Sequence, residues 1–113
     1  MHEYSITDSI LKLAVDKASE AGAGKVTRIN LVLGELSGIV DDCVRFYFDF
    51  LSRETVAAGA FLSFTKIPVK LRCRNCSREY LPVNQPWRCP QCHETGTEII
   101  SGRECHMESI EVE

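Results

Sequence analysis

Two short cysteine motifs constrain this 113-residue chain more than any other feature. CRNC occupies residues 73–76 and CPQC occupies residues 89–92, with twelve residues between them. A CxxC motif turns tightly enough to direct both of its sulfur atoms toward one point, so two motifs can surround one ion tetrahedrally. Zn²⁺ accepts this arrangement because it has no geometric preference of its own. The spacing predicts a zinc site with four ligands: Cys73, Cys76, Cys89 and Cys92.

Disulfides and chance proximity are the alternatives to a metal at these four cysteines. The first ten residues contain Glu3 and Asp8, no lysine or arginine, and no long apolar run, so no secretion signal is visible. We therefore expect a cytoplasmic location, where thiols stay reduced. Iron in the same sulfur cage is a minor variant of the prediction. Four protein ligands leave no position for a substrate, so the zinc is expected to be structural.

The remaining sequence predicts an α+β fold with two helices and a small, mixed three-stranded sheet. Apolar residues recur at helical spacing after Ser5 and alternate with polar residues in KVTRINLVLGEL at 25–36. A second helix follows, and the other two strands are AFLSFTKIPV at 60–69 and ECHMESIEVE at 104–113. Because a helix separates the first two strands, they should be parallel with a right-handed crossover. The cysteine segment joins the second and third strands as a zinc-ribbon-like insert.

The starts of the two helices are predicted from capping residues. Ser5 and Asp8 have the spacing of a capping box at the first helix. Asp41 or Asp42 is predicted to cap the second helix, and Gly59 is predicted to stop it.

The sequence also predicts how the chain is divided. Residues 1–68 and 97–113 are assigned to the α/β domain, and residues 69–96 to the zinc-binding insert. In the second helix, Phe46 and Phe50 are expected to widen the apolar face that packs on the sheet.

Beyond the chain start, four other cysteine and histidine residues lie outside the cysteine pairs. Cys43 and Cys105 are interpreted as small buried apolar residues of the second helix and the last strand. Cys105 and His106 are neighbours on a strand and point to opposite faces, so they do not form a nucleophile and its base. His93 directly follows the second motif, and it is either a bystander on the rim of the site or an auxiliary ligand.

Charge is distributed unevenly along the chain, although the net charge is only -3. Residues 66–92 carry six basic groups against Glu79 alone, a net +5, and residues 93–113 carry a net -5. The basic segment is expected to offset the formal charge of -2 that zinc has with four thiolates. Together with Tyr80 and Trp87 as stacking groups, it also leaves open a zinc ribbon that binds nucleic acid or protein.

The chain start, MHEY, offers a second set of metal donors. The imidazole Nδ1 of His2, the backbone nitrogens of His2 and Glu3 and the terminal amine of Met1 can close small chelate rings around one ion. Planar nitrogen ligands suit Ni(II) or Cu(II). A histidine at a chain end is usually only solvated, so the residues alone leave this site open.

Several motifs occur in one order along the whole chain: MHEYSITDSI at the start, GELSG at 34–38, the paired CxxC motifs, and a GRE…ESIEVE close. This combination resembles the HypA/HybF family of hydrogenase maturation factors, which are nickel metallochaperones. The resemblance implies that His2 is the nickel ligand, that Glu3 supports it, and that the paired cysteines hold zinc. The α/β domain is then the nickel-binding domain. ECHM at 104–107 departs from the family pattern.

The resemblance implies a carrier that passes nickel to the large subunit of [NiFe] hydrogenase, together with a GTPase partner, and in some members to urease. An enzyme is not expected, because the chain has no convincing acid–base pair, nucleophile elbow or phosphate loop. No stretch is long enough to span a bilayer, and the overall charge argues against nucleic acid. A zinc-ribbon binding module without a nickel function is the alternative. A monomer and a homodimer both fit.

Overall fold

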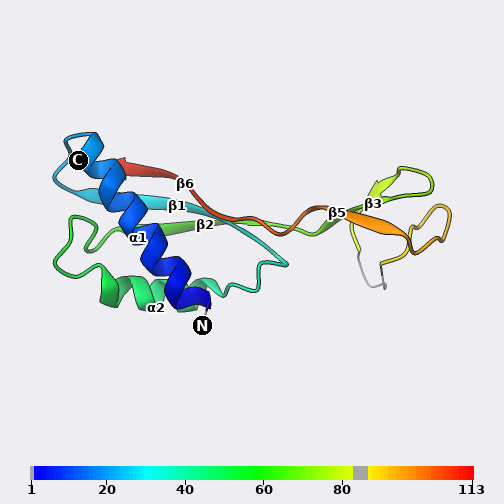
Figure 1. Cartoon of the computed structure of the whole chain (residues 1–113), viewed down its shortest axis with the longest axis horizontal. Helices are drawn as coiled ribbons and strands as arrows, with labels where there is room; N and C mark the ends of the chain where they lie inside the picture. Colours follow the sequence, from blue (N-terminus) through cyan, green and yellow to red (C-terminus); the bar gives the residue numbers. More distant parts are fainter. Residues whose placement is uncertain (1, 83–86) are drawn as a thin grey trace. The chain divides into compact units, whose positions relative to one another are not determined.

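The computed structural model describes residues 2–82 and 87–113, and of His2 only the backbone (Figure 1). These residues form two compact units. The first comprises the chain up to Val32 together with Gly38–Thr65 and Cys105–Glu113, and the second comprises Leu33–Ser37 and Lys66–Glu104.

The first unit contains two helices and a mixed three-stranded sheet, which confirms the predicted fold class. The sheet has the order β2-β1-β6, and α1 packs against both α2 and β6 (Figure 1). The five elements are α1 (His2–Glu20), β1 (Val26–Gly34), α2 (Asp41–Leu51), β2 (Phe61–Ile67) and β6 (Cys105–Val112).

The core of this unit follows the periodicities of the sequence. In α1, Ile10, Ala14 and Ala18 recur at intervals of four residues and are buried. In β1, Ile29 and Leu31 alternate with partly exposed polar residues. All five side chains belong to one hydrophobic cluster, so the helix stripe and the strand face meet as the sequence predicts.

The first helix begins earlier than predicted. It starts at His2, so Ser5 lies inside the helix and the capping-box prediction is wrong. Asp8 forms an ion pair with Lys12 at 2.9 Å, one helical turn further on. Glu3 lies in the first turn, where a carboxylate interacts favourably with the positive end of the helix dipole.

The second helix also has different ends. Its N-cap residue is Val40, which makes no side-chain capping bond in the described structure, so the predicted Asp41 or Asp42 cap is wrong. The two aspartates lie in the first turn instead. The helix ends at Leu51, well before Gly59, and the Ser52 N–H donates to a main-chain carbonyl of the last turn.

The outer face of α2 carries the two phenylalanines that were expected to widen its buried face. Phe46 is 70% exposed and Phe50 is 60% exposed, whereas Val44 and Phe48 are buried. A step of 100° per residue places positions 46 and 50 roughly opposite positions 44 and 48. Their rings lie against Tyr47 and the Arg53 guanidinium, with centroid distances of 5.4 and 5.6 Å.

The second unit has a sheet of its own, which the sequence patterns did not predict. Three short strands pair antiparallel in the order β4-β3-β5. They are β3 (Lys70–Cys73), β4 (Glu79–Tyr80) and β5 (Thr97–Ser101). Such short strands contain too few residues to display a clear alternation of apolar and polar side chains.

Residues 33–37, 66–68 and 97–104 belong to this second unit, whereas the sequence-based division assigned them to the first domain. Backbone N–H groups of Gly34, Glu35 and Leu36 donate to the carbonyls of Glu104, Ile67 and Gly102. The contact requires glycine at position 34, because a Cβ there would lie 2.1 Å from the Gly102 carbonyl carbon. The assignment of a nickel-binding domain and a zinc-binding insert stays a prediction.

Within the described residues, neither helix combines the length and the apolar character that crossing a membrane requires.

Candidate metal centre

Two turns with the same backbone geometry present the four cysteines of the paired motifs. Cys73 ends β3, and the Ser77 N–H donates to its carbonyl at 2.9 Å. In the second turn the His93 N–H donates to the Cys89 carbonyl, also at 2.9 Å. Ser77 and His93 both have φ of +64°, the left-handed conformation that reverses the chain after each CxxC motif.

The four sulfur atoms converge as predicted. Their ligand atoms all lie within 4.8 Å of one another. The Sγ atoms of Cys73 and Cys92 are 3.4 Å apart, and those of Cys76 and Cys89 are 3.6 Å apart. A tetrahedral zinc site with Zn–S bonds of about 2.3 Å requires sulfur separations of about 3.8 Å. Therefore the donor set and its geometry fit zinc.

The disulfide alternative is not realised in this structure. All six cysteines lie among the described residues, and all are free thiols. A disulfide needs a sulfur separation of about 2.05 Å, which is far shorter than the separations within the cluster.

The local surroundings change the pKa values of the clustered thiols in both directions. Burial opposes ionisation of Cys89, but the N–H groups of Cys92 and Gln91, which donate to its sulfur, lower its pKa to about 6. At Cys76 the backbone N–H of Arg78 lowers the pKa, but burial and the neighbouring sulfur atoms outweigh it and raise the pKa to about 11. A cluster of this kind holds protons that a bound cation displaces.

A small apolar core supports the site. Leu71 is fully buried beside Cys73 and Cys89, and the ring of Tyr80 lies in the same cluster. Burial, followed by the charges of the cysteine sulfurs, raises the pKa of Tyr80. Its hydroxyl is buried and has no hydrogen-bond partner in the part of the chain that the structure describes. Arg78 Nη1 connects the two turns by donating to Gln91 Oε1 at 3.2 Å.

Ion pairs use part of the positive charge that was expected to offset the thiolates. Lys70 pairs with Glu79 at 3.1 Å, and Arg72 pairs with Glu79 at 3.0 Å and with Glu98 at 3.1 Å. These contacts run across the three strands of the second sheet. The net +5 of residues 66–92 already counts Glu79, so only the pairing of Arg72 with Glu98, from outside the segment, offsets its charge further.

The other cysteines and histidines singled out from the sequence do not belong to the four-cysteine cluster. Cys43 is exposed on α2, so the prediction of a buried residue is wrong there. Cys105 is partly buried, and burial raises its pKa. His106 is exposed on β6. Among the described residues the metal cluster contains only the four paired cysteines, and His93, interpreted as either a bystander or an auxiliary ligand, is not one of its members.

The proposed nickel donors at the chain start lie mostly outside the described residues, namely Met1 and the His2 side chain. The backbone of His2 forms the first residue of α1, whose opening N–H groups have no intrahelical carbonyl to bind. Glu3 Oε2 accepts a hydrogen bond from the Val40 N–H at 3.2 Å. Hydrogen bonds from its own backbone N–H and from that of Val40 lower the pKa of Glu3.

The comparisons with known proteins agree over the whole chain. A family described as "Hydrogenase/urease nickel incorporation, metallochaperone, hypA" matches residues 1–112. The hydrogenase maturation factor HypA of Dehalococcoides mccartyi strain 195 is 48% identical over 113 residues, which cover 100% of this chain and 95% of the relative. The HypA of Caldanaerobacter subterraneus is 40% identical over 114 residues, with both chains fully covered.

Two solved structures share the fold. The solution structure of a HypA protein has a TM-score of 0.76 at 29% identity and covers 99% of this chain and 96% of the other. The solution structure of the nickel metallochaperone HypA from Helicobacter pylori has a TM-score of 0.67 at 26% identity, with 97% and 96% covered.

Proposed function

Since the chain belongs to the HypA family of hydrogenase/urease nickel-incorporation metallochaperones, we propose that it binds Ni(II) at its N-terminus and delivers it for maturation of [NiFe] hydrogenase. Urease is the second candidate client. The observation that carries the proposal is the family match over residues 1–112, which includes both the MHE start and the paired cysteines.

The cargo site consists of nitrogen donors at the chain start. The His2 imidazole is the principal ligand, and the backbone nitrogens of His2 and Glu3 and the amine of Met1 complete a planar set, which suits Ni(II). Because α1 begins at His2, the first N–H groups have no preceding main-chain carbonyl to bind, and that of Glu3 donates to its own carboxylate. Glu3, whose carboxylate is held by the Val40 N–H, supports the site from outside the ligand set.

Zinc is the resident metal, and its role is structural. The four thiolates would close its coordination and stabilise a unit whose own core is small. Metal held in this closed site is not delivered. The protein therefore retains its zinc and exchanges its nickel. It catalyses no reaction of its own.

The partners follow from the delivery role. We propose the nickel-delivery GTPase of the maturation system and the large subunit of [NiFe] hydrogenase, with the carrier acting in the cytoplasm as a monomer or homodimer. No nucleic-acid or membrane partner is proposed. The alternative of a nucleic-acid-binding zinc ribbon loses support from the ion pairs of Lys70 and Arg72, which reduce the free positive charge of the basic segment.

The decisive experiment measures metal content and nickel affinity on protein with its untagged start, next to His2→Ala. We expect one tightly held zinc in both proteins and one exchangeable nickel that the variant loses. His106→Ala is the matched control, because His106 is an exposed histidine of β6 outside the proposed site. Nickel binding that survives His2→Ala unchanged would contradict the terminal site, whatever the His106→Ala variant shows.

A further inference from the structure

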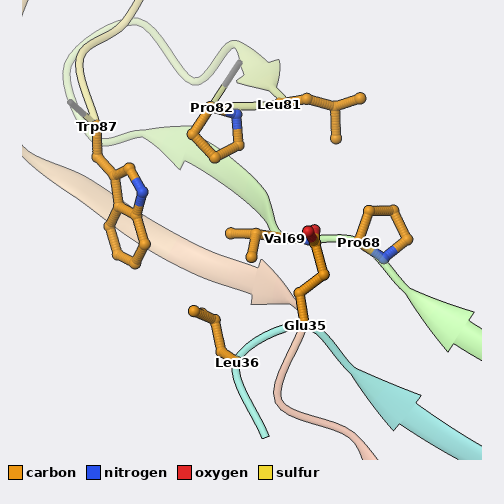
Figure 2. A pocket seen from close by; sticks show the side chains of 7 residues that line it. All are labelled: Glu35, Leu36, Pro68, Val69, Leu81, Pro82 and Trp87. Atoms are coloured by element: carbon orange, nitrogen blue, oxygen red, sulfur yellow. The ribbon is translucent and has the colours of Figure 1, made fainter. Parts of the chain in front are cut away.

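A cavity of about 380 Å³ lies in the second unit, next to the GELSG motif that the metal sites leave unexplained. Glu35 and Leu36 of the motif line one part of it. Figure 2 shows Leu36 and Val69 directed toward the indole of Trp87, with the Glu35 carboxylate beside Val69. Pro68, Leu81 and Pro82 complete its wall.

The apolar part of this cavity is open to solvent. Leu36 is 39% exposed, Leu81 is 52% exposed and Trp87 is 39% exposed. Singly exposed apolar side chains are common on proteins. Here three of them line one cavity together with two prolines, which is the composition of a recognition pocket.

Among the described residues that line the cavity, Glu35 is the one with an ionisable side chain. Its Oε1 accepts the Val69 N–H at 2.6 Å, which holds the carboxylate in position. Two carboxylate oxygens can accept about four hydrogen bonds, so this contact leaves acceptor capacity for a ligand. The cavity therefore combines apolar walls, an aromatic ring and a fixed negative charge.

We infer that this pocket binds an arginine side chain of a partner protein. The methylene groups of arginine match the Leu36, Val69 and proline walls. The guanidinium can stack on the indole of Trp87 and donate two parallel hydrogen bonds to the Glu35 carboxylate. Lysine offers the charge without the planar donor pair, so it fits less well.

The experiment uses the fluorescence of Trp87, which is the single tryptophan of the chain. Zinc-loaded protein is titrated with N-acetyl-arginine methylamide, with the corresponding lysine derivative, and with the citrulline derivative, which has the shape of arginine without its charge. Free N-acetyl-tryptophanamide controls for collisional quenching. We expect saturable binding in the order arginine, lysine, citrulline, with arginine at least about tenfold tighter than citrulline.

The Glu35→Gln variant tests the role of the charge. The glutamine amide oxygen can still accept the Val69 N–H, so the local backbone contact is kept. We expect arginine affinity to fall at least about tenfold, to the level of citrulline. The Leu36→Ala variant should weaken both ligands and preserve their ratio.

Three outcomes would overturn the inference. They are the absence of saturable binding by the arginine derivative, equal affinity for arginine and citrulline, and an arginine affinity that Glu35→Gln leaves unchanged. The comparison of arginine with citrulline needs only the unmodified chain, so the test stands even if a variant fails to fold. It does not depend on nickel, since the metal at the chain start is absent from the assay.

Discussion

The carboxylate of Glu3 accepts a hydrogen bond from the backbone N–H of Val40 at 3.2 Å. Glu3 lies in the first turn of α1, and Val40 is the N-cap residue of α2, so the bond connects the starts of the two helices. The same residue is proposed to support nickel at His2. A substitution of Glu3 therefore affects both the helix junction and the cargo site, and the two effects have to be separated.

The variants Glu3→Gln and Glu3→Ala measure the effect on the helix junction separately from any effect on nickel binding. Glutamine keeps an oxygen that can accept the Val40 N–H, whereas alanine removes it. We expect Glu3→Ala to lower the thermal midpoint of unfolding more than Glu3→Gln does, because a backbone donor at a helix start loses its acceptor. Calorimetry of the zinc-loaded, nickel-free proteins measures the difference. Equal midpoints for the two variants would mean that the hydrogen bond contributes nothing to stability.

Removing one zinc ligand should prevent the second unit from folding. Apparent binding free energies of structural zinc are on the order of 10–16 kcal/mol in small zinc-finger peptides, more than a core of this size supplies. We expect Cys89→Ser to lose zinc and the near-ultraviolet circular dichroism of Trp87, and zinc content is measured by elemental analysis.

Cys43→Ser is the matched control for Cys89→Ser. Cys43 is an exposed thiol of α2 outside the cluster, so its replacement should leave one zinc per chain. Full zinc content in Cys89→Ser would contradict the four-sulfur site.

Truncation of two phenylalanines of α2 should reduce stability to very different extents. Phe48 is 4% exposed within the core, and Phe46 is 70% exposed on the outer face. Phe48→Ala should reduce the free energy of unfolding by about 3–5 kcal/mol, because it removes buried apolar surface and leaves a cavity. Phe46→Ala should change it by about 0.5 kcal/mol or less.

Denaturant unfolding of the two phenylalanine variants gives the comparison within one helix and one residue type. A larger loss of stability in Phe46→Ala would indicate that the outer face of α2 is buried against a partner or a second copy.

Glu79 should make the second unit sensitive to acid. Hydrogen bonds from Arg72 and then Lys70 lower its pKa below the ordinary 4.5. A carboxyl group with a lowered folded-state pKa contributes stability that is complete above its unfolded pKa and is lost as pH falls through the folded pKa. The contribution of Glu79 should therefore begin to decline near pH 4.5 and disappear as the pH falls through its lower folded-state pKa.

Glu79→Gln isolates this contribution from protonation of the zinc thiolates. The variant should be less stable than the unmodified chain at pH 7, and the difference should shrink toward zero in acid. A titration of the Glu79 carboxyl carbon by NMR reads its pKa directly. A value at or above 4.5 would contradict the ion pairs with Arg72 and Lys70.

The zinc centre could be predicted from sequence because its chemistry is local. The motifs at 73–76 and 89–92 each determine a tight turn, and their short separation limits where the second pair can lie. Similarly, the buried stripe of α1 and the alternation of β1 follow from the periodicity of each element alone. The nickel site was reached through family resemblance, because a lone histidine near a chain start has no distinctive pattern.

Only the tertiary structure decided the features that depend on residues far apart in the chain. The N-cap residue of α2, Val40, donates its N–H to the Glu3 carboxylate of α1, and no local capping pattern contains that information. The cavity beside Glu35 also depends on distant residues, because Leu36 and Trp87, which are far apart in the chain, both line it. The sequence by itself determined the cysteine turns and the apolar faces, since each is a property of a short segment. Contacts between distant segments decided helix ends, strand partners and the pocket, because long-range packing overrides weak local preferences.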